Sequence, residues 1–184
     1  MFERFTQAAR DLVRGAAERA ERDGDSHVAP EHLLRQLLAG SGTEGAVALA
    51  AAGVDSEARR AGVLRGLDEA RRRGGLTKSD TEALAGIGID VAAVVDHVES
   101  AHGPGALARR RAWRRGRTRF DAEAKAVLER SLRIALGRGD KAIGDEHILL
   151  ALAAAPGIAA EVLADHGATY AAIEAALPAV QRAG

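Results

Sequence analysis

The sequence predicts an all-α protein in which two copies of one four-helix module form a single domain. Three observations lead to this prediction: a pattern recurs 115 positions apart (120 − 5 = 115), apolar residues follow helical spacing, and no segment alternates convincingly with period two. Apolar residues make up 47% of the 184 residues, aromatic residues only 3%, and alanine supplies much of the apolar share. Helices packed closely through small side chains fit that composition better than an aromatic-rich β-sandwich.

The repeat is the strongest of these observations. Three pairs of identical residues share the spacing: Phe5 and Phe120, Gly24 and Gly139, and Asp25 and Asp140. The tetrapeptides Glu-His-Leu-Leu at 31–34 and Glu-His-Ile-Leu at 146–149 have it too, since 146 − 31 = 115. A repeat identifies the structural unit, so any site on the module is expected twice.

Four helices are predicted in the first module. Thr6 is a good N-cap for a helix that Gly24 ends, and Pro30 suits the first turn of the next helix. A short apolar helix follows over residues 46–52, and a fourth helix runs over about 56–73.

The second module has the same order. Asp121 is predicted to cap a helix that Gly139 ends, and Asp145 to cap the helix of residues 146–154. Helices over 158–166 and 169–182 complete the module. Because no segment alternates convincingly between apolar and polar residues, we expect no β-sheet.

The segment between the modules is interpreted as an elaborated linker. Helices are expected over 79–84 and 91–102, and Gly88-Ile89-Asp90 resembles Gly53-Val54-Asp55. The chain therefore divides into residues 1–60, 61–117 and 118–184, with the first and last parts forming one domain.

Composition excludes several classes of protein. The chain has no cysteine, which rules out disulfides and thiolate metal sites. Its first residues lack the apolar run of a signal peptide, and no stretch approaches the roughly 20 apolar residues of a membrane span. We expect a soluble cytoplasmic protein without membrane contact.

Three segments carry a family resemblance: Met1-Phe2-Glu3-Arg4-Phe5-Thr6, the Gly-Asp and Glu-His-Leu-Leu pattern over 24–34, and residues 143–150. They resemble the N-terminal domain of Clp-family unfoldases, the double Clp-N repeat, most closely that of the ClpC type. The resemblance covers residues 5–60 and 118–182. It implies two four-helix repeats related by a pseudo-twofold axis, which receive substrates and adaptors for an AAA+ ring. Lys78-Ser79 lacks the preceding glycine-rich loop of an ATP site, so the chain is expected to bind without a motor.

The resemblance to ClpC-type domains also implies a reader of phosphorylated arginine, in which a glutamate takes the guanidinium and a threonine helps to hold the phosphate. The matching positions are Thr6 with Glu31 in repeat one and Asp121 with Glu146 in repeat two. Asp121 would place a negative charge beside the phosphate, so the second site is interpreted as degenerate. An alternative stays open, because these residue types are also ordinary N-caps and first-turn acids.

All three phenylalanines, Phe2, Phe5 and Phe120, lie at the starts of the repeats. The resemblance implies that this surface docks apolar peptides and cyclic-peptide antibiotics aimed at the unfoldase. The alternative, which we favour for Phe5 and Phe120, is that they are core residues preceding the first helix of each repeat.

Neither catalysis nor metal binding is expected. His32 and His147 match across the repeats, but neither has a second ligand three or four residues away. No nucleophile elbow or zinc-protease motif occurs, so we predict a non-enzymatic protein without cofactors.

The segment from Arg109 to Arg119 contains seven arginines and no acid. Nucleic acid could contact it at these side chains: Arg110, Arg111, Trp113, Arg114 and Arg115. A solvated linker is the preferred interpretation.

The sequence therefore predicts a binding module of the Clp protease system. Its expected partners are unfoldase and protease components and their substrates or adaptors, and it would act as an adaptor or a decoy. The alternatives are a nucleic-acid-associated regulator working through the Arg109–Arg119 segment and a protein that sequesters cyclic-peptide antibiotics.

Overall fold

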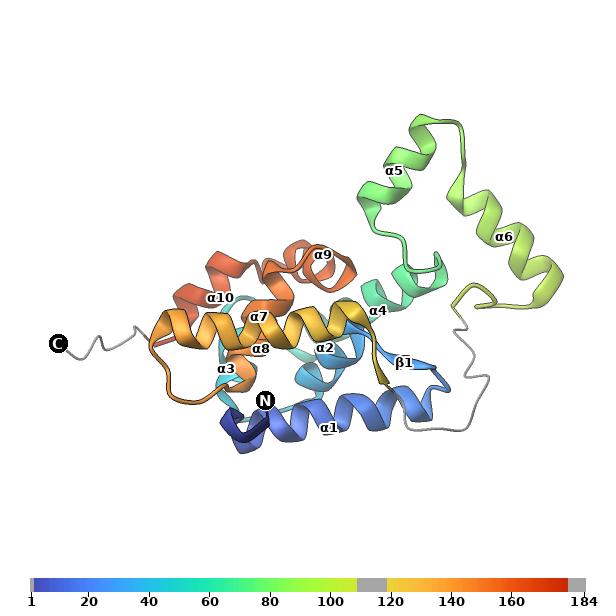
Figure 1. Ribbon diagram of the computed structural model, residues 1–184. Helices are drawn as coiled ribbons and strands as arrows, with labels where there is room; N and C mark the ends of the chain where they lie inside the picture. Colours follow the sequence, from blue (N-terminus) through green and yellow to red (C-terminus); the bar gives the residue numbers. More distant parts are fainter. Residues whose placement is uncertain (1, 109–118, 179–184) are drawn as a thin grey trace.

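The computed structural model describes residues 2–108 and 119–178, and it confirms the all-α prediction (Figure 1). After a short 3-10 helix, Phe2–Arg4, repeat one contains α1 (Gln7–Arg22), α2 (Pro30–Ala39), α3 (Glu44–Ala51) and α4 (Glu57–Arg72). Repeat two contains α7 (Ala122–Arg138), α8 (Asp145–Ala154), α9 (Ile158–Asp165) and α10 (Tyr170–Ala176).

The predicted starts of the first helix in each repeat are confirmed. The Thr6 hydroxyl accepts a hydrogen bond from the Ala9 N–H at 3.2 Å, and the Asp121 carboxylate accepts one from Ala124 at 2.7 Å. These side chains satisfy N–H groups that have no partner within the first helical turn.

Two predicted boundaries are wrong. The N-cap of α8 is Gly144, because the carboxylate of Asp145 instead bonds to the start of α3. Helix α10 ends at Ala176 rather than near 182, since Pro178 follows closely and cannot continue a helical hydrogen-bond ladder.

The expectation of no sheet is also wrong, although the sheet is minimal. Strands β1 (His27–Val28) and β2 (Arg119–Phe120) pair in parallel, with Val28 opposite Phe120. Segments of two residues are too short to show alternation in the sequence. Phe5 forms the matching bridge with Ile143, because 120 − 5 and 143 − 28 both equal 115. Each repeat thus pairs its first segment with the other repeat's second, as a pseudo-twofold axis requires.

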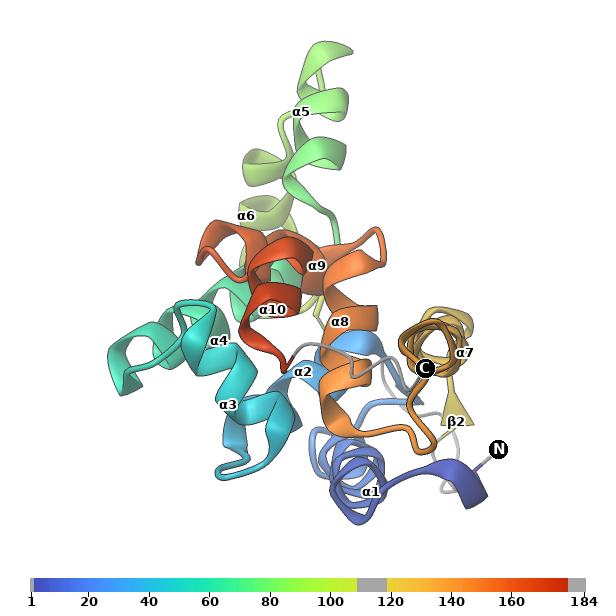
Figure 2. The same ribbon diagram turned by 90° about the vertical axis from the view of Figure 1, so that its left-hand side faces the viewer.

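The repeats share one core. Helix α8 contributes a continuous buried run from Ile148 to Leu152, and α2 contributes Leu33 and Leu34. Around these central helices, α4 packs on α9 and α10 packs on α3. The second halves of the repeats therefore cover each other across the pseudo-twofold axis (Figure 2).

The linker contains α5 (Lys78–Gly86) and α6 (Val91–His102), and α6 has the predicted bounds. In both views this hairpin stands out from the body of the protein (Figures 1 and 2). Helix α4 crosses the predicted boundary at residue 60, and the division of the chain into three parts stays a prediction.

Within residues 2–108 and 119–178, no single helix has the length and apolarity to cross a membrane. The bent pair α8 and α9 meets that test only jointly, by length and composition, with 94° between its helices.

Candidate functional site

The structure joins the predicted site residues crosswise between the repeats. The Thr6 N–H donates to the Ile143 carbonyl at 2.9 Å, which places Thr6 beside the segment leading to Glu146. The Asp121 N–H donates to the Val28 carbonyl at 3.0 Å, which places Asp121 beside the segment leading to Glu31. These bonds place each N-cap beside the other repeat, and the predicted site of Thr6 with Glu31 stays a prediction.

Glu31 is the carboxylate that the fold leaves available. It is half-buried in the first turn of α2, and no hydrogen bond or ion pair joins it to another described residue. It lines a cavity of about 300 Å³ between α2, α7, α9 and the start of α5. An acid without a protein partner beside a cavity is free to bind a basic group.

The walls of this cavity combine charged and apolar groups. Its ionisable side chains are Glu31, Asp80, Glu123 and Arg130, a formal charge of −2 (one cation against three acids). The Arg130 guanidinium donates to the Ala154 carbonyl at 2.9 Å, while its buried Nε has no partner among the described residues. Apolar walls come from Val127, Leu152 and Ile158, among others. The cavity is thus suited to a ligand with a cationic group and an apolar stem.

Glu146, the counterpart of Glu31, is turned inward. It is 8% exposed, and its Oε1 lies 2.7 Å from His147 Nδ1. Burial alone would raise the pKa of Glu146, but the hydrogen bond with His147, a backbone hydrogen bond and the charge of His147 together outweigh burial, so the pKa lies below its usual value. Burial alone would lower the pKa of His147, but Glu146 and Asp140 together raise it. The two side chains therefore form a buried ion pair.

His147 Nδ1 has two competing partners. It lies 3.0 Å from the Gly144 N–H, from which only a neutral ring could accept a hydrogen bond. A protonated ring would instead donate through the same atom to Glu146. The raised pKa of His147 favours the protonated ring and the bond to Glu146.

One residue explains why the two glutamates point differently. The backbone at Gly144 (φ −90°, ψ 175°) matches that at Ala29 (φ −100°, ψ 166°), and 144 − 29 = 115. A Cβ at Gly144 would collide with both carboxylate oxygens of Glu146. Because Ala29 carries that Cβ, Glu31 is kept out of the inward position and stays at the cavity.

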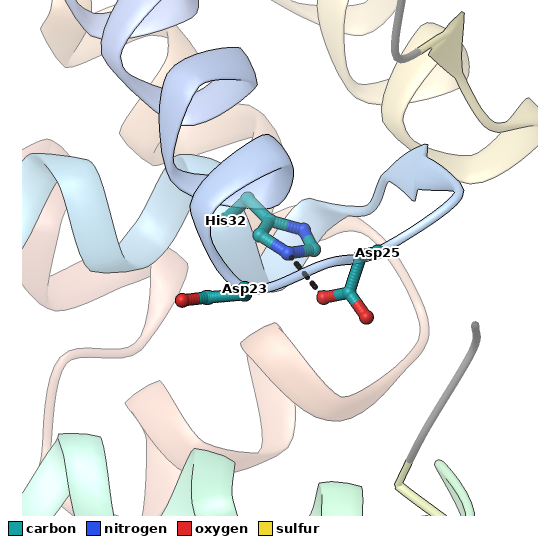
Figure 3. Close-up of side chains that lie close together, drawn as sticks. All are labelled: Asp23, Asp25 and His32. Atoms are coloured by element: carbon teal, nitrogen blue, oxygen red, sulfur yellow. Dashed lines mark hydrogen bonds and ion pairs between the residues drawn. The ribbon is translucent and has the colours of Figure 1, made fainter. Parts of the chain in front are cut away.

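Each repeat contains an aspartate–histidine pair that the sequence analysis missed. His32 Nδ1 accepts from the Ala29 N–H at 3.0 Å, and its Nε2 lies 3.0 Å from Asp25 (Figure 3). His147 makes the same contact with Asp140 at 2.9 Å. Each aspartate lies seven residues before its histidine, which is not the spacing of three or four residues that places two ligands on one helix face. The repeat does align Asp25 with Asp140.

Asp23, Asp25 and His32 place ligand atoms within 4.8 Å of one another, which is a spacing that a metal site would need. Both His32 nitrogens and both Asp25 oxygens have protein partners, however, since Arg71 lies 2.6 Å from the second Asp25 oxygen. Figure 3 shows the Asp23 side chain extending away from the bonded pair. The cluster therefore acts within the fold, by tying the ends of α1 and α4 to the start of α2.

Asp145 differs from its counterpart in repeat one in what it contacts. Its carboxylate accepts hydrogen bonds from the Thr43 side chain and the Gly45 N–H, at the start of α3, and burial raises its pKa. A Cβ at Gly45 would lie 2.6 Å from that carboxylate, so the glycine makes room for it. Repeat one has Pro30 at the matching position (145 − 30 = 115), and Pro30 lines the cavity at the start of α9.

The structure describes the side chains of two of the three phenylalanines in the predicted apolar face. Phe5 is buried in the core and Phe120 is half-buried against it, as the core interpretation predicts. The Phe2 side chain lies outside the described part of the structure. The predicted nucleic-acid contacts, Arg110, Arg111, Trp113, Arg114 and Arg115, also lie outside the described residues.

The sequence model of the Clp repeat N-terminal domain matches residues 4–86, 74–166 and 119–182, which together span nearly the whole chain. The chain belongs to this family. Clp N-domains are protein-interaction modules of Clp and Hsp100 unfoldases. The pseudo-twofold arrangement and the shared core described above are the family's double-repeat fold.

Two solved structures, the first two of the following three, agree with this assignment of the fold. The N-terminal domain of ClpD from Arabidopsis thaliana has a TM-score of 0.50 at 20% identity, covering 96% of each chain. A protein from a malarial protein secretion system has a TM-score of 0.51 at 14% identity, covering 94% of this chain and 90% of its own. The Hsp104 N-terminal domain from Candida albicans has a TM-score of 0.48 at 19% identity, covering 94% and 87%.

The buried pair in repeat two predicts a pH dependence of stability. Because the folded pKa of His147 is raised, its stabilisation is complete below the unfolded value of about 6.5 and is lost as pH rises through the folded pKa. Urea unfolding between pH 6 and 9 should therefore show a free energy of unfolding that falls with pH. His147→Gln should flatten this decline. His32→Gln, at the matching position without a bonded glutamate, should retain it; a retained slope in His147→Gln would contradict the assignment.

Proposed function

We propose that this Clp N-domain is a non-catalytic protein-binding module of the Clp protease system in the bacterial cytoplasm. It binds what an unfoldase N-domain binds, and acts as an adaptor that delivers substrates or as a decoy that withholds them. The observation that carries the proposal is Glu31, a carboxylate that has no hydrogen bond or ion pair with another described residue and that lines the cavity between α2, α5, α7 and α9.

The ligand proposed for this cavity is a protein that carries phosphorylated arginine. Glu31 would take the guanidinium, since a carboxylate matches its planar pair of donors. Arg130, whose Nε is unpaired, would face the phosphate. The family resemblance gave the phosphate to Thr6. Because Thr6 lies beside repeat two, we assign the phosphate to Arg130, which lines the same cavity as Glu31.

A binding titration tests the assignment of Glu31. We expect Glu31→Ala to weaken binding of a phosphoarginine peptide by at least tenfold, because a charge-assisted bond is worth about 1.5–3 kcal/mol. Glu57→Ala is the matched control, since Glu57 also lies in the first turn of a helix but does not line this cavity. The fluorescence of Trp113, the only tryptophan, or calorimetry would follow the titration. Equal affinity of Glu31→Ala and Glu57→Ala would refute the site.

A degradation assay separates the two roles. The protein is added to a ClpC-type unfoldase and its protease with an arginine-phosphorylated substrate. Faster turnover identifies an adaptor and slower turnover a decoy, and Glu31→Ala should abolish either effect. Unchanged turnover, together with no binding to the unfoldase or substrate, would refute both.

A further inference from the structure

The hairpin α5–α6 repeats the turn that links the last two helices of each repeat. In α3–α4, α5–α6 and α9–α10, a left-handed glycine follows a helix of eight or nine residues: Gly53, Gly88 and Gly167. In each turn the glycine N–H bonds three residues back and the next N–H five residues back, at 2.9 to 3.1 Å. The same turn also ends α1, α4 and α7, but only these three hairpins share the sequence Leu-Ala-x-x-Gly before it, at 49–53, 84–88 and 163–167. In sequence and in its turn, the hairpin therefore resembles the second half of a repeat.

The α5–α6 hairpin differs from the other two in what covers its apolar face. Leu84 and Ile89 occupy the positions of Leu49 and Val54 (84 − 49 and 89 − 54 both equal 35). Leu49 and Val54 are buried, whereas Leu84 is half-buried and Ile89 is 41% exposed. The hairpin thus carries core-type side chains without the core that covers them in the repeats.

More of the hairpin's apolar surface is open. Val94 occupies the position of Ile173 (173 − 94 and 167 − 88 both equal 79), and Ile173 is fully buried whereas Val94 is 48% exposed. Ile87, in the turn itself, is 73% exposed. Large apolar side chains gathered on one projecting element indicate an interaction surface rather than scattered surface residues.

The fold shows what normally covers such a half-repeat. Helices α3–α4 and α9–α10 pack on each other around the pseudo-twofold axis, with α4 on α9 and α10 on α3. Among the described residues, α5–α6 has no half-repeat packed on it in this way. It buries Val91 and Val95 of α6, and polar contacts also hold its base, from Lys78 to Asp165 at 2.5 Å and from Arg72 to Glu99 at 2.5 Å. These contacts leave the exposed apolar residues uncovered.

We propose that the α5–α6 hairpin docks against the same hairpin of a second copy of this chain, forming a homodimer about a true twofold axis. The interface would repeat between molecules the packing of half-repeat on half-repeat that exists within one molecule. A twofold contact of this kind uses the same patch on both partners, so one self-complementary surface suffices.

Charge sets the strength of this dimer. Residues 76–105 contain five acids and one lysine, a net charge of −4. Asp96 and Glu99 are paired with Arg72, which leaves Asp80, Glu82 and Asp90 as exposed acids without a cation partner in the described structure. Like charges across the axis weaken the contact, so the dimer should strengthen with salt because screening reduces the repulsion.

Sedimentation of the full-length protein over a range of concentrations tests the proposal. We expect a concentration-dependent dimer whose dissociation constant falls at least twofold between 50 and about 500 mM salt, as screening of the repulsion grows. Ile89→Asp should leave a monomer at every concentration. Val47→Asp is the matched control: Val47 is 60% exposed, but it lies on α3, so its substitution should leave dimerisation unchanged. A wild-type monomer at all concentrations would overturn the proposal.

Cross-linking gives an independent measurement, because the chain has no native cysteine. Under mild oxidation, Ile89→Cys should form disulfide-linked dimers at least tenfold faster than Val47→Cys. Circular dichroism would confirm that both variants fold. Equal rates for the two variants would mean that the hairpin is not the interface, whatever the oligomeric state.

Discussion

Gly144→Ala is expected to destabilise the protein by about 2 kcal/mol, although the backbone there suits any residue. The new Cβ would occupy the place of the Glu146 carboxylate, so this side chain must turn outward. His147 then loses its bonded carboxylate while it stays buried. Urea unfolding at pH 6 would measure the loss, which should shrink as pH rises through the raised pKa of His147, because the pair then contributes less.

Gly137→Ala is the matched control, since a Cβ at Gly137 meets no atom within 4 Å and alanine favours a helix. It should stabilise the protein slightly. If Gly144→Ala lowers the free energy of unfolding by less than about 0.5 kcal/mol, the Glu146 side chain must adopt another favourable position within the core.

The reciprocal substitution, Ala29→Gly, tests the same explanation from the other repeat. Removing the Cβ opens the inward position to Glu31, next to His32, and ligand affinity at the cavity should fall even though Glu31 is unchanged. Stability should change by only a few tenths of a kcal/mol, about the usual difference between alanine and glycine at such positions. Unchanged affinity would mean that Ala29 does not hold Glu31 at the cavity.

Asp25→Asn is expected to cost about 3 kcal/mol of stability, the largest effect of any single substitution proposed. Asp25 is 6% exposed, and its two oxygens bind His32 and Arg71. An asparagine presents a donor to one of these donors, which leaves a buried polar group without a partner. Chemical denaturation of the full chain would measure the loss.

Asp140→Asn is the matched control in the other repeat. Asp140 makes the same contact with His147, but its side chain is 42% exposed and its arginine, Arg138, lies 3.4 Å away. Water can compensate there, so we expect about 1 kcal/mol or less. Equal losses at Asp25 and Asp140 would contradict the importance of burial.

The repeat in the sequence predicted the helices well because most helix starts have a capping side chain or a proline, and most ends have a glycine. It could not predict the two-residue strands, which are too short for a pattern. It placed the N-cap of α8 one residue late, because Asp145 would be a normal cap if α3 were not beside it. Long-range contacts of this kind are invisible in local sequence.

The site was predicted less completely than the fold. Glu31 and Glu146 were identified, but the identity of their neighbours decides which one is available, and Gly144 and Ala29 look interchangeable in a sequence. The pairing of Thr6 with Glu31, implied by the resemblance, stays a prediction, and the sequence did not show that backbone hydrogen bonds join each repeat's N-cap to the other repeat. Arg130 carries no motif and is found only through the cavity.

The crossed pairing of segments between the repeats also explains how the two repeats are held together. The bonds from Thr6 to Ile143 and from Asp121 to Val28 cross between the repeats, so each repeat supplies an edge that the other lacks. Non-covalent contacts therefore join the two repeats, in addition to the covalent chain. A peptide bond cut between residues 108 and 119 would leave two fragments that remain one folded body, while either fragment alone would have two unpaired edges and half a core.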